Sequence, residues 1–170
     1  MRQWMALGTA ALALAGCARA DRPVPAGPVA IEADSIRYET SMCFGACPVY
    51  AVTLRPDGTG IFEGKRFTTV TGTREFKLSK AEYDAFAAKL APYRPESGTL
   101  RYMPDDKQHC AQAATDLPGV DVVWTRAIGD SQTLNYYFGC DMDKNQDMAE
   151  AIGSAPEEVP ALEALIGPRP

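Results

Sequence analysis

The chain has 170 residues, 46% of them hydrophobic, and a formal net charge of −5 at pH 7. This length suits one domain with a real core, and an acidic chain without a basic stripe is a poor binder of nucleic acid. No apolar run approaches the roughly 18 residues that a membrane-spanning helix needs, which excludes a membrane-spanning chain.

The N-terminus has the pattern of an export signal. Arg2 precedes an apolar stretch, residues 4–15, whose length is that of a signal-peptide core. The stretch ends in Leu14-Ala15-Gly16-Cys17, which resembles the lipobox of bacterial lipoproteins: an aliphatic residue, two small residues and a cysteine. The resemblance implies cleavage after residue 16 and acyl chains, palmitate among them, on Cys17. The alternative is an ordinary secretory signal peptide with a chance cysteine.

The expected lipid anchor sets the predicted domain organisation. Each buried CH₂ contributes about 0.8 kcal/mol, so several acyl chains hold a protein firmly to a membrane. Ala18 follows the cysteine, and by resemblance to lipoprotein sorting this favours the outer membrane, facing the periplasm. Residues 17–30 are rich in proline and predict an extended tether of up to roughly 40 Å. We expect a signal peptide at residues 1–16, the lipidated cysteine and tether at 17–30, and one domain at 31–170.

Alternating apolar residues predict a strand at residues 31–40 and a second at Val49–Leu54, with a loop between them. A turn at Pro56-Asp57-Gly58 follows, because proline presets φ and glycine accepts positive φ. Residues 60–64 and 66–70 continue this meander, and residues 73–78 form a further strand.

Helix signals come next. Ser79 and Glu82 have the spacing of a capping box, and the helix that they open has one apolar face. Residues 95–108 are predicted to have irregular structure. Residues 120–128 and 132–138 predict a hairpin, joined at Gly129-Asp130-Ser131, and residues 157–166 predict a terminal helix.

The order of these elements predicts the fold class. Helices follow blocks of strands, without β-α-β alternation. We therefore predict an α+β fold, in which an antiparallel sheet of about six strands carries two helices on one face.

Four cysteines remain besides Cys17: Cys43, Cys47, Cys110 and Cys140. An even number of cysteines in an oxidising compartment predicts two disulfides. Proximity in sequence favours Cys43 with Cys47, which leaves Cys110 with Cys140. The two crossed pairings stay open.

Several short motifs carry a family resemblance. A core motif, Cys43-Phe44-Gly45-Ala46-Cys47-Pro48-Val49-Tyr50, precedes an Asp57-Gly58 turn, Phe62-Glu63-Gly64 and Val70-Thr71-Gly72. Further along lie Thr115-Asp116-Leu117-Pro118 and Tyr137-Phe138-Gly139-Cys140. Over residues 36–166 the chain resembles a bacterial family called domain of unknown function 6438. The resemblance implies an envelope-associated domain of unassigned activity and transfers no catalytic residue.

The core motif also resembles the C-x-x-x-C-P motif of copper chaperones of the Sco type, which use a distal histidine, and soft thiolates suit Cu(I). His109 is the only histidine of the chain. In those chaperones the motif leads into a helix, whereas here a strand is expected after Pro48. A redox role would need a depressed thiol pKa, and residues 41–53 contain no lysine or arginine. We therefore favour a structural disulfide.

The remaining polar patterns are weaker. Asp141-x-Asp143-x-Asn145 begins like a calcium-binding EF-hand loop, but Gln146 and Ile152 replace the required glycine and glutamate. A solvated acidic loop leading into a short helix is the better interpretation. No Gly-x-Ser-x-Gly motif marks a nucleophile. The sequence thus predicts no catalytic residue, no metal ligand and no cofactor.

Two functional hypotheses follow. The first is a non-enzymatic binding or structural module of the cell envelope, with the membrane and an envelope protein as partners. The second is a thiol-redox or copper-handling protein that acts through Cys43 and Cys47.

Overall fold

The computed structural model describes residues 34–127 and 131–168. Its strands are β1 (Ser35–Thr40), β2 (Val49–Leu54), β3 (Thr59–Arg66), β4 (Gly72–Lys77), β5 (Thr99–Tyr102), β6 (Gly119–Thr125) and β7 (Gln132–Tyr137). Its α-helices are α1 (Lys80–Leu90), α2 (Gln146–Ser154) and α3 (Ala161–Ile166), with the 3₁₀ turns η1 (Ala91–Tyr93) and η2 (Ala155–Glu158). None of these helices is long and apolar enough to cross a membrane.

The described strands form one sheet in the order β4-β3-β2-β1-β6-β7-β5. All neighbouring strands are antiparallel except β5 and β7, which are parallel. The predicted α+β class and largely antiparallel sheet are confirmed, although the described part has seven strands rather than about six. The extra strand is β5, a short edge strand within the stretch that was predicted to be irregular.

The predicted strand at residues 66–70 is wrong. β3 runs through Arg66, and the chain turns at Phe67, whose φ is 54°. The backbone N–H groups of Thr69 and Val70 then donate to the carbonyl oxygens of Ile166 and Leu165. The backbone N–H groups of this segment are therefore hydrogen-bonded to the C-terminal helix rather than to a neighbouring strand.

The predicted hairpin is confirmed by the antiparallel pairing of β6 with β7. Its connecting turn falls largely on residues 128–130, outside the described residues. The terminal helix is present as α3, shorter than predicted and preceded by η2. Two helices were expected on one face of the sheet, and the described residues contain three α-helices. The additional helix, α2, lies where a short helix was expected after the acidic loop.

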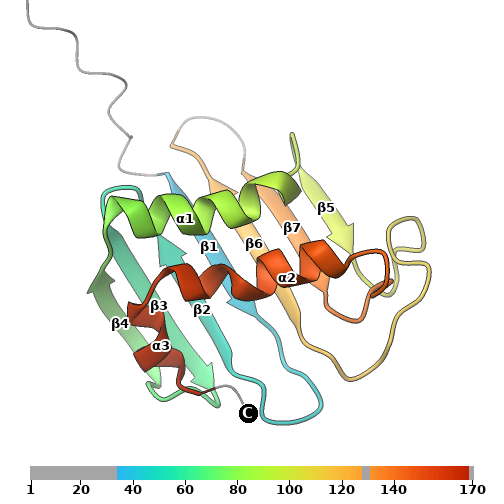
Figure 1. Cartoon of the computed structure of the whole chain (residues 1–170), viewed down its shortest axis with the longest axis horizontal. Helices are drawn as coiled ribbons and strands as arrows, with labels where there is room; N and C mark the ends of the chain where they lie inside the picture. Colours follow the sequence, from blue (N-terminus) through green and yellow to red (C-terminus); the bar gives the residue numbers. More distant parts are fainter. Residues whose placement is uncertain (1–33, 128–130, 169–170) are drawn as a thin grey trace, which may run out of the picture.

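All three α-helices lie over the same face of the sheet, with α1 and α2 side by side (Figure 1). Between the two layers lies the core, which takes Val52, Phe62 and Tyr136 from the strands and Phe86 and Ile152 from the helices, each 0% exposed. A sheet with one covered face explains the alternation of apolar and polar residues along its strands.

The opposite face carries charged side chains over the middle of the sheet. Arg37 pairs with Glu39 at 2.7 Å and with Glu63 at 3.7 Å, and Lys65 also pairs with Glu39. Partial burial alone would raise the pKa of Glu39, but the hydrogen bonds from Lys65 and Arg37 lower it overall. Beneath this network Ala51 is fully buried.

The capping box at the start of α1 is present in both directions. The backbone N–H of Glu82 donates to the Ser79 hydroxyl, and the backbone N–H of Ser79 donates to the Glu82 carboxylate. We expect Ser79→Ala to lower the free energy of unfolding by about 1 kcal/mol, because it removes one of these acceptors. Urea unfolding checks this, and an unchanged midpoint would contradict it. Ser97→Ala, in a loop, is the control.

Tyr136 contributes a buried hydroxyl that has no hydrogen-bond partner among the described residues. Burial raises the pKa of Tyr136 to about 12. Above pH 10 the unfolded chain loses this proton while the folded chain keeps it, so stability falls as pH rises towards 12, by up to roughly 1.4 kcal/mol per pH unit.

Tyr136→Phe removes this buried polar group without removing the ring. We expect the variant to be neutral or more stable by about 1–2 kcal/mol at pH 7. It should also lose less stability between pH 10 and 12 than the wild type. Thermal unfolding across this pH range checks both points. A large destabilisation at pH 7 would show that the hydroxyl has an essential partner.

Candidate functional site

The motif segments meet at one end of the sheet, where β1 and β7 end and β2 and β6 begin. The backbone N–H of Ser41 donates to the carbonyl oxygen of Gly119 at 2.9 Å, and the N–H of Gly119 donates to the Ser41 hydroxyl at 2.7 Å. The N–H of Phe44 donates to the carbonyl oxygen of Asp116 at 3.1 Å. These bonds dock the loop at residues 41–48 onto the segment before β6.

The segment before β6 is also fixed to the end of β7. The Tyr137 hydroxyl accepts from the N–H of Leu117 at 3.2 Å and donates to the carbonyl oxygen of Ala114 at 2.9 Å. The N–H of Phe138 donates to the carbonyl oxygen of Pro118 at 3.1 Å. Three motifs that are far apart in sequence therefore form one connected structure.

An apolar cleft of about 420 Å³ opens between these motifs and the helices. The strands provide its floor, α2 provides Gly153 and α3 provides Ile166. Its lining consists of Tyr38, Thr40, Cys47, Pro48, Tyr50, Leu117, Pro118, Gly119, Val120, Phe138, Gly153 and Ile166. No lining residue is charged. We call this hollow the motif cleft.

The polar groups in the floor of the motif cleft are engaged within the protein. The Thr40 hydroxyl donates to the carbonyl oxygen of Pro48 at 2.9 Å and accepts from the N–H of Tyr50 at 3.0 Å. The Tyr38 hydroxyl donates to the carbonyl oxygen of Ile152 at 3.2 Å. The lining includes no histidine, carboxylate or amine for acid–base work. Its chemistry suits the binding of an apolar group.

Gly153 keeps one wall of the motif cleft open. A Cβ atom there would lie 3.5 Å from Cε1 of Phe138, an ordinary contact, and its backbone is not in the left-handed region. Packing therefore does not require glycine at this position, although glycine in a helix costs about 0.5–1 kcal/mol relative to alanine. Sequence reasoning missed Gly153, because no motif surrounds it.

Other glycines of the motifs serve the backbone instead. Gly58 has a φ of 82°, and a Cβ atom there would lie 2.7 Å from the carbonyl oxygen of Leu78. At Gly64 a Cβ atom would overlap the carbonyl oxygen of Val70. The glycines of the turn and of the Phe62-Glu63-Gly64 motif are thus required by close backbone approach.

The structure pairs Cys43 with Cys47 and Cys110 with Cys140, with Cα–Cα distances of 5.8 and 5.2 Å. This is the favoured pairing. The two bridges differ in accessibility: Cys110 and Cys140 are fully buried, whereas Cys43 and Cys47 are partly exposed. Cys47 also lines the motif cleft.

Exposed apolar side chains gather beside the disulfide loop. Phe44, at its tip, is 87% exposed, and Met42 and Phe67 are 61% and 52% exposed. Arg66 joins the last two, since its guanidinium lies 3.0 Å from the Met42 sulfur and 5.0 Å from the centre of the Phe67 ring. We call Met42, Phe44 and Phe67 the apolar rim.

His109 lies outside the motif cleft. Its Nδ1 is 2.9 Å from a carboxylate oxygen of Asp106, and its ring lies beside that of Tyr102. The hydrogen bond with His109 lowers the pKa of Asp106. The structure therefore gives His109 a local carboxylate partner and does not bring it to the motif cleft.

The acidic loop has a structural role. The Asp141 carboxylate accepts from the backbone N–H groups of Ala111 at 2.9 Å and Gln112 at 2.8 Å, and these bonds lower its pKa. The side-chain amide of Asn145 donates to the carbonyl oxygen of Cys140. Within residues 34–127 and 131–168, no group of three or more His, Cys, Asp or Glu side chains could hold a metal ion.

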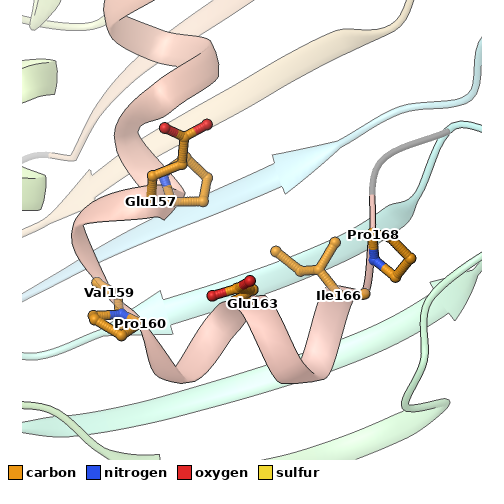
Figure 2. Close-up of a pocket in the computed structure, with 8 residues that line it drawn as sticks. Glu157, Val159, Pro160, Glu163, Ile166 and Pro168 are labelled. Atoms are coloured by element: carbon orange, nitrogen blue, oxygen red, sulfur yellow. The ribbon is translucent and has the colours of Figure 1, made fainter.

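Two further hollows adjoin the motif cleft. One, of about 450 Å³, is lined by Met42 and Met103 and also by charged side chains, among them Glu39, Lys65 and Arg66. The other, of about 380 Å³, lies among η2, α3 and the segment after it, and shares Ile166 with the motif cleft (Figure 2). Its lining includes Glu157 and Glu163 but no disulfide-loop residue. The motif cleft is the stronger candidate site, because it is lined by residues of three motifs and, unlike both hollows, by no charged side chain.

Comparison with models of protein families identifies the family of the chain. The family model described as Domain of unknown function (DUF6438) matches residues 34–156, more than two thirds of the chain. The chain belongs to this family, as its motifs predicted. Neither the curated proteins nor the solved structures gave a match. The expected lipidation site, Cys17, lies outside the described residues.

Proposed function

We propose that this member of the DUF6438 family is a lipid-anchored binding module of the bacterial cell envelope, and that the motif cleft is its ligand site. One observation carries the proposal: residues of three separate motifs line an uncharged cleft whose wall is kept open by Gly153. An apolar pocket with few polar groups is the usual form of a ligand site.

The position of the cleft fits a tethered module. The described chain enters the sheet at Ser35, the start of β1, and the motif cleft lies beyond Thr40, at the other end of that strand. A strand of this length spans roughly 20 Å. A lipidated Cys17 would therefore hold the domain by the end that lies opposite the cleft, and the cleft would be open to a periplasmic partner.

Apolar-probe binding tests the ligand site. We would titrate the exported chain carrying Cys17→Ser, which has no acyl chain to compete, with 8-anilinonaphthalene-1-sulfonate. Gly153→Leu should fill the cleft and abolish most of the fluorescence gain. Ala151→Leu, on the same helix but outside the lining, should leave the signal unchanged. Equal signals from all three chains would reject the cleft as the site.

Metabolic labelling tests the anchor. Cells that express the full chain are fed radiolabelled palmitate, and the label should appear on the wild type and be absent from Cys17→Ser. Fractionation should place the labelled protein in the outer membrane. Label on both chains, or on neither, would refute lipidation at Cys17.

A redox role is the second candidate, favoured by the partial exposure of the Cys43–Cys47 bridge beside the cleft. A periplasmic dithiol would reduce the bridge: two thiols donate two electrons and two protons, the bridge opens to two thiols, and the donor becomes a disulfide. Cu(I) binding would need this reduced form. A reduction potential below about −300 mV, typical of inert bridges, would argue against the redox candidate.

A further inference from the structure

We propose that the Cys43–Cys47 disulfide is a redox switch of the motif cleft, which binds its apolar ligand while the bridge is closed and loses most of its affinity when the bridge is reduced. The inference rests on the proposed function and adds the regulation of that site. It differs from the thiol-redox candidate, because the two cysteines control binding and pass no electrons to a substrate.

The Cys43–Cys47 bridge holds one part of the cleft wall in place. Cys47 lines the cleft, and within the described residues no hydrogen bond holds residues 45–47. The positions on either side are hydrogen-bonded, Phe44 through its N–H and Pro48 through its carbonyl oxygen. The disulfide is therefore the link that fixes Cys47 in the wall.

The closed loop depends on a constrained backbone at Gly45. Its φ of 141° lies in a region that favours glycine over all other residues. Opening the bridge removes the covalent restraint, so residues 45–47 gain conformational freedom. A wall that must be ordered again on binding costs affinity, because the site is no longer preorganised.

The two disulfides of the domain differ in their access to a reductant. Cys110 and Cys140 are 0% exposed, and their bridge joins the segment before β6 to the end of β7, both of which supply lining residues. Cys43 and Cys47 are partly exposed. A dithiol can therefore reach the bridge of the disulfide loop while the buried bridge keeps the other segments of the cleft in place.

The switching reaction is a two-electron exchange with a dithiol donor. The S–S bond between Cys43 and Cys47 breaks, and both become thiols as they take up two electrons and two protons. The donor loses these electrons and protons and becomes a disulfide. Ligand affinity and this equilibrium are linked reciprocally, so a bound ligand should stabilise the closed bridge by the factor by which reduction weakens binding.

Dye titration in two redox states tests the switch. The Cys17→Ser chain is titrated with 8-anilinonaphthalene-1-sulfonate before and after dithiothreitol reduces the accessible bridge, and alkylation with mass spectrometry verifies that Cys110–Cys140 stays closed. Gly153→Leu gives the signal that does not come from the cleft. Reduction should weaken binding in the cleft by roughly fivefold or more, the lower end of the usual coupling between linked sites. Equal affinity in both states, or a bridge that resists dithiothreitol in the folded chain, would overturn the switch.

Replacing Cys43 and Cys47 together by alanine provides the matched variant, because this chain cannot close the bridge. It should bind the dye as weakly as the reduced chain and should not respond to dithiothreitol. Binding as tight as that of the oxidised chain, or a response of the variant to dithiothreitol, would overturn the switch.

A redox titration measures the reciprocal effect. In glutathione buffers, saturating dye should make the midpoint potential of the Cys43–Cys47 bridge more negative by about 30 mV for each tenfold difference in dye affinity. An unshifted midpoint would overturn the switch. If the dye still distinguishes Gly153→Leu from Ala151→Leu, the switch alone fails. If the dye does not, the proposed site fails with it.

Discussion

Replacing Cys110 and Cys140 together by alanine is expected to lower the free energy of unfolding by roughly 3–4 kcal/mol, the value for a bridge that closes a loop of this length. The two cysteines are 30 residues apart and fully buried, and their bridge joins the segment before β6 to the end of β7. The double variant avoids leaving one thiol alone in the core. Chemical unfolding of the oxidised protein measures the change.

The second bridge serves as the matched control. Cys43 and Cys47 are only four residues apart, so their replacement by alanine should cost less, about 2 kcal/mol. The replacement should instead alter the conformation of the loop that carries Phe44, which the bridge closes. An equal or larger loss of stability from the Cys43 and Cys47 double variant would contradict this division of roles.

Two glycine-to-alanine changes should move stability in opposite directions. Gly64→Ala forces a methyl group against the carbonyl oxygen of Val70, between two backbone segments that have little freedom to separate. Overpacking of this kind costs about 1–3 kcal/mol. Gly153→Ala fits beside Phe138 and should stabilise the chain by about 0.5–1 kcal/mol.

The same urea series can compare both variants with the wild type. A destabilised Gly153→Ala would mean that packing requires the glycine. It would contradict the proposal that the glycine serves to keep the cleft open. A neutral Gly64→Ala would mean that the β3–β4 connection adapts easily. The pair therefore separates glycines needed by the fold from the glycine that widens the cleft.

Local patterns predicted the elements that have strong local signals. The limits of β2 and the capping box of α1 follow directly from alternation and from the Ser79–Glu82 spacing. β5 was not predicted, because a strand of four residues at a sheet edge shows little periodicity of apolar residues. Its position is set by its pairing with β7. Residues 66–70 were misassigned because their backbone donors are satisfied by α3, a contact that no local window contains.

The site was only partly predictable. The cysteine motif and the segments around Pro118 and Phe138 were visible as motifs, and the favoured disulfide pairing followed from spacing. Their assembly into one cleft depends on long-range hydrogen bonds such as that from Phe44 to Asp116. The walls at Gly153 and Ile166 come from helices without any sequence motif, so the cleft itself appears only in three dimensions.

Crosslinking from inside the motif cleft is the most direct test of the account. Benzoylphenylalanine at Leu117, which lines the cleft, is compared in living cells with the same residue at Thr73, on the exposed edge strand β4. We predict a discrete adduct from position 117 that Gly153→Leu abolishes, and none from position 73. No adduct from position 117, or one that Gly153→Leu leaves unchanged, would contradict the assignment of the cleft as the binding site.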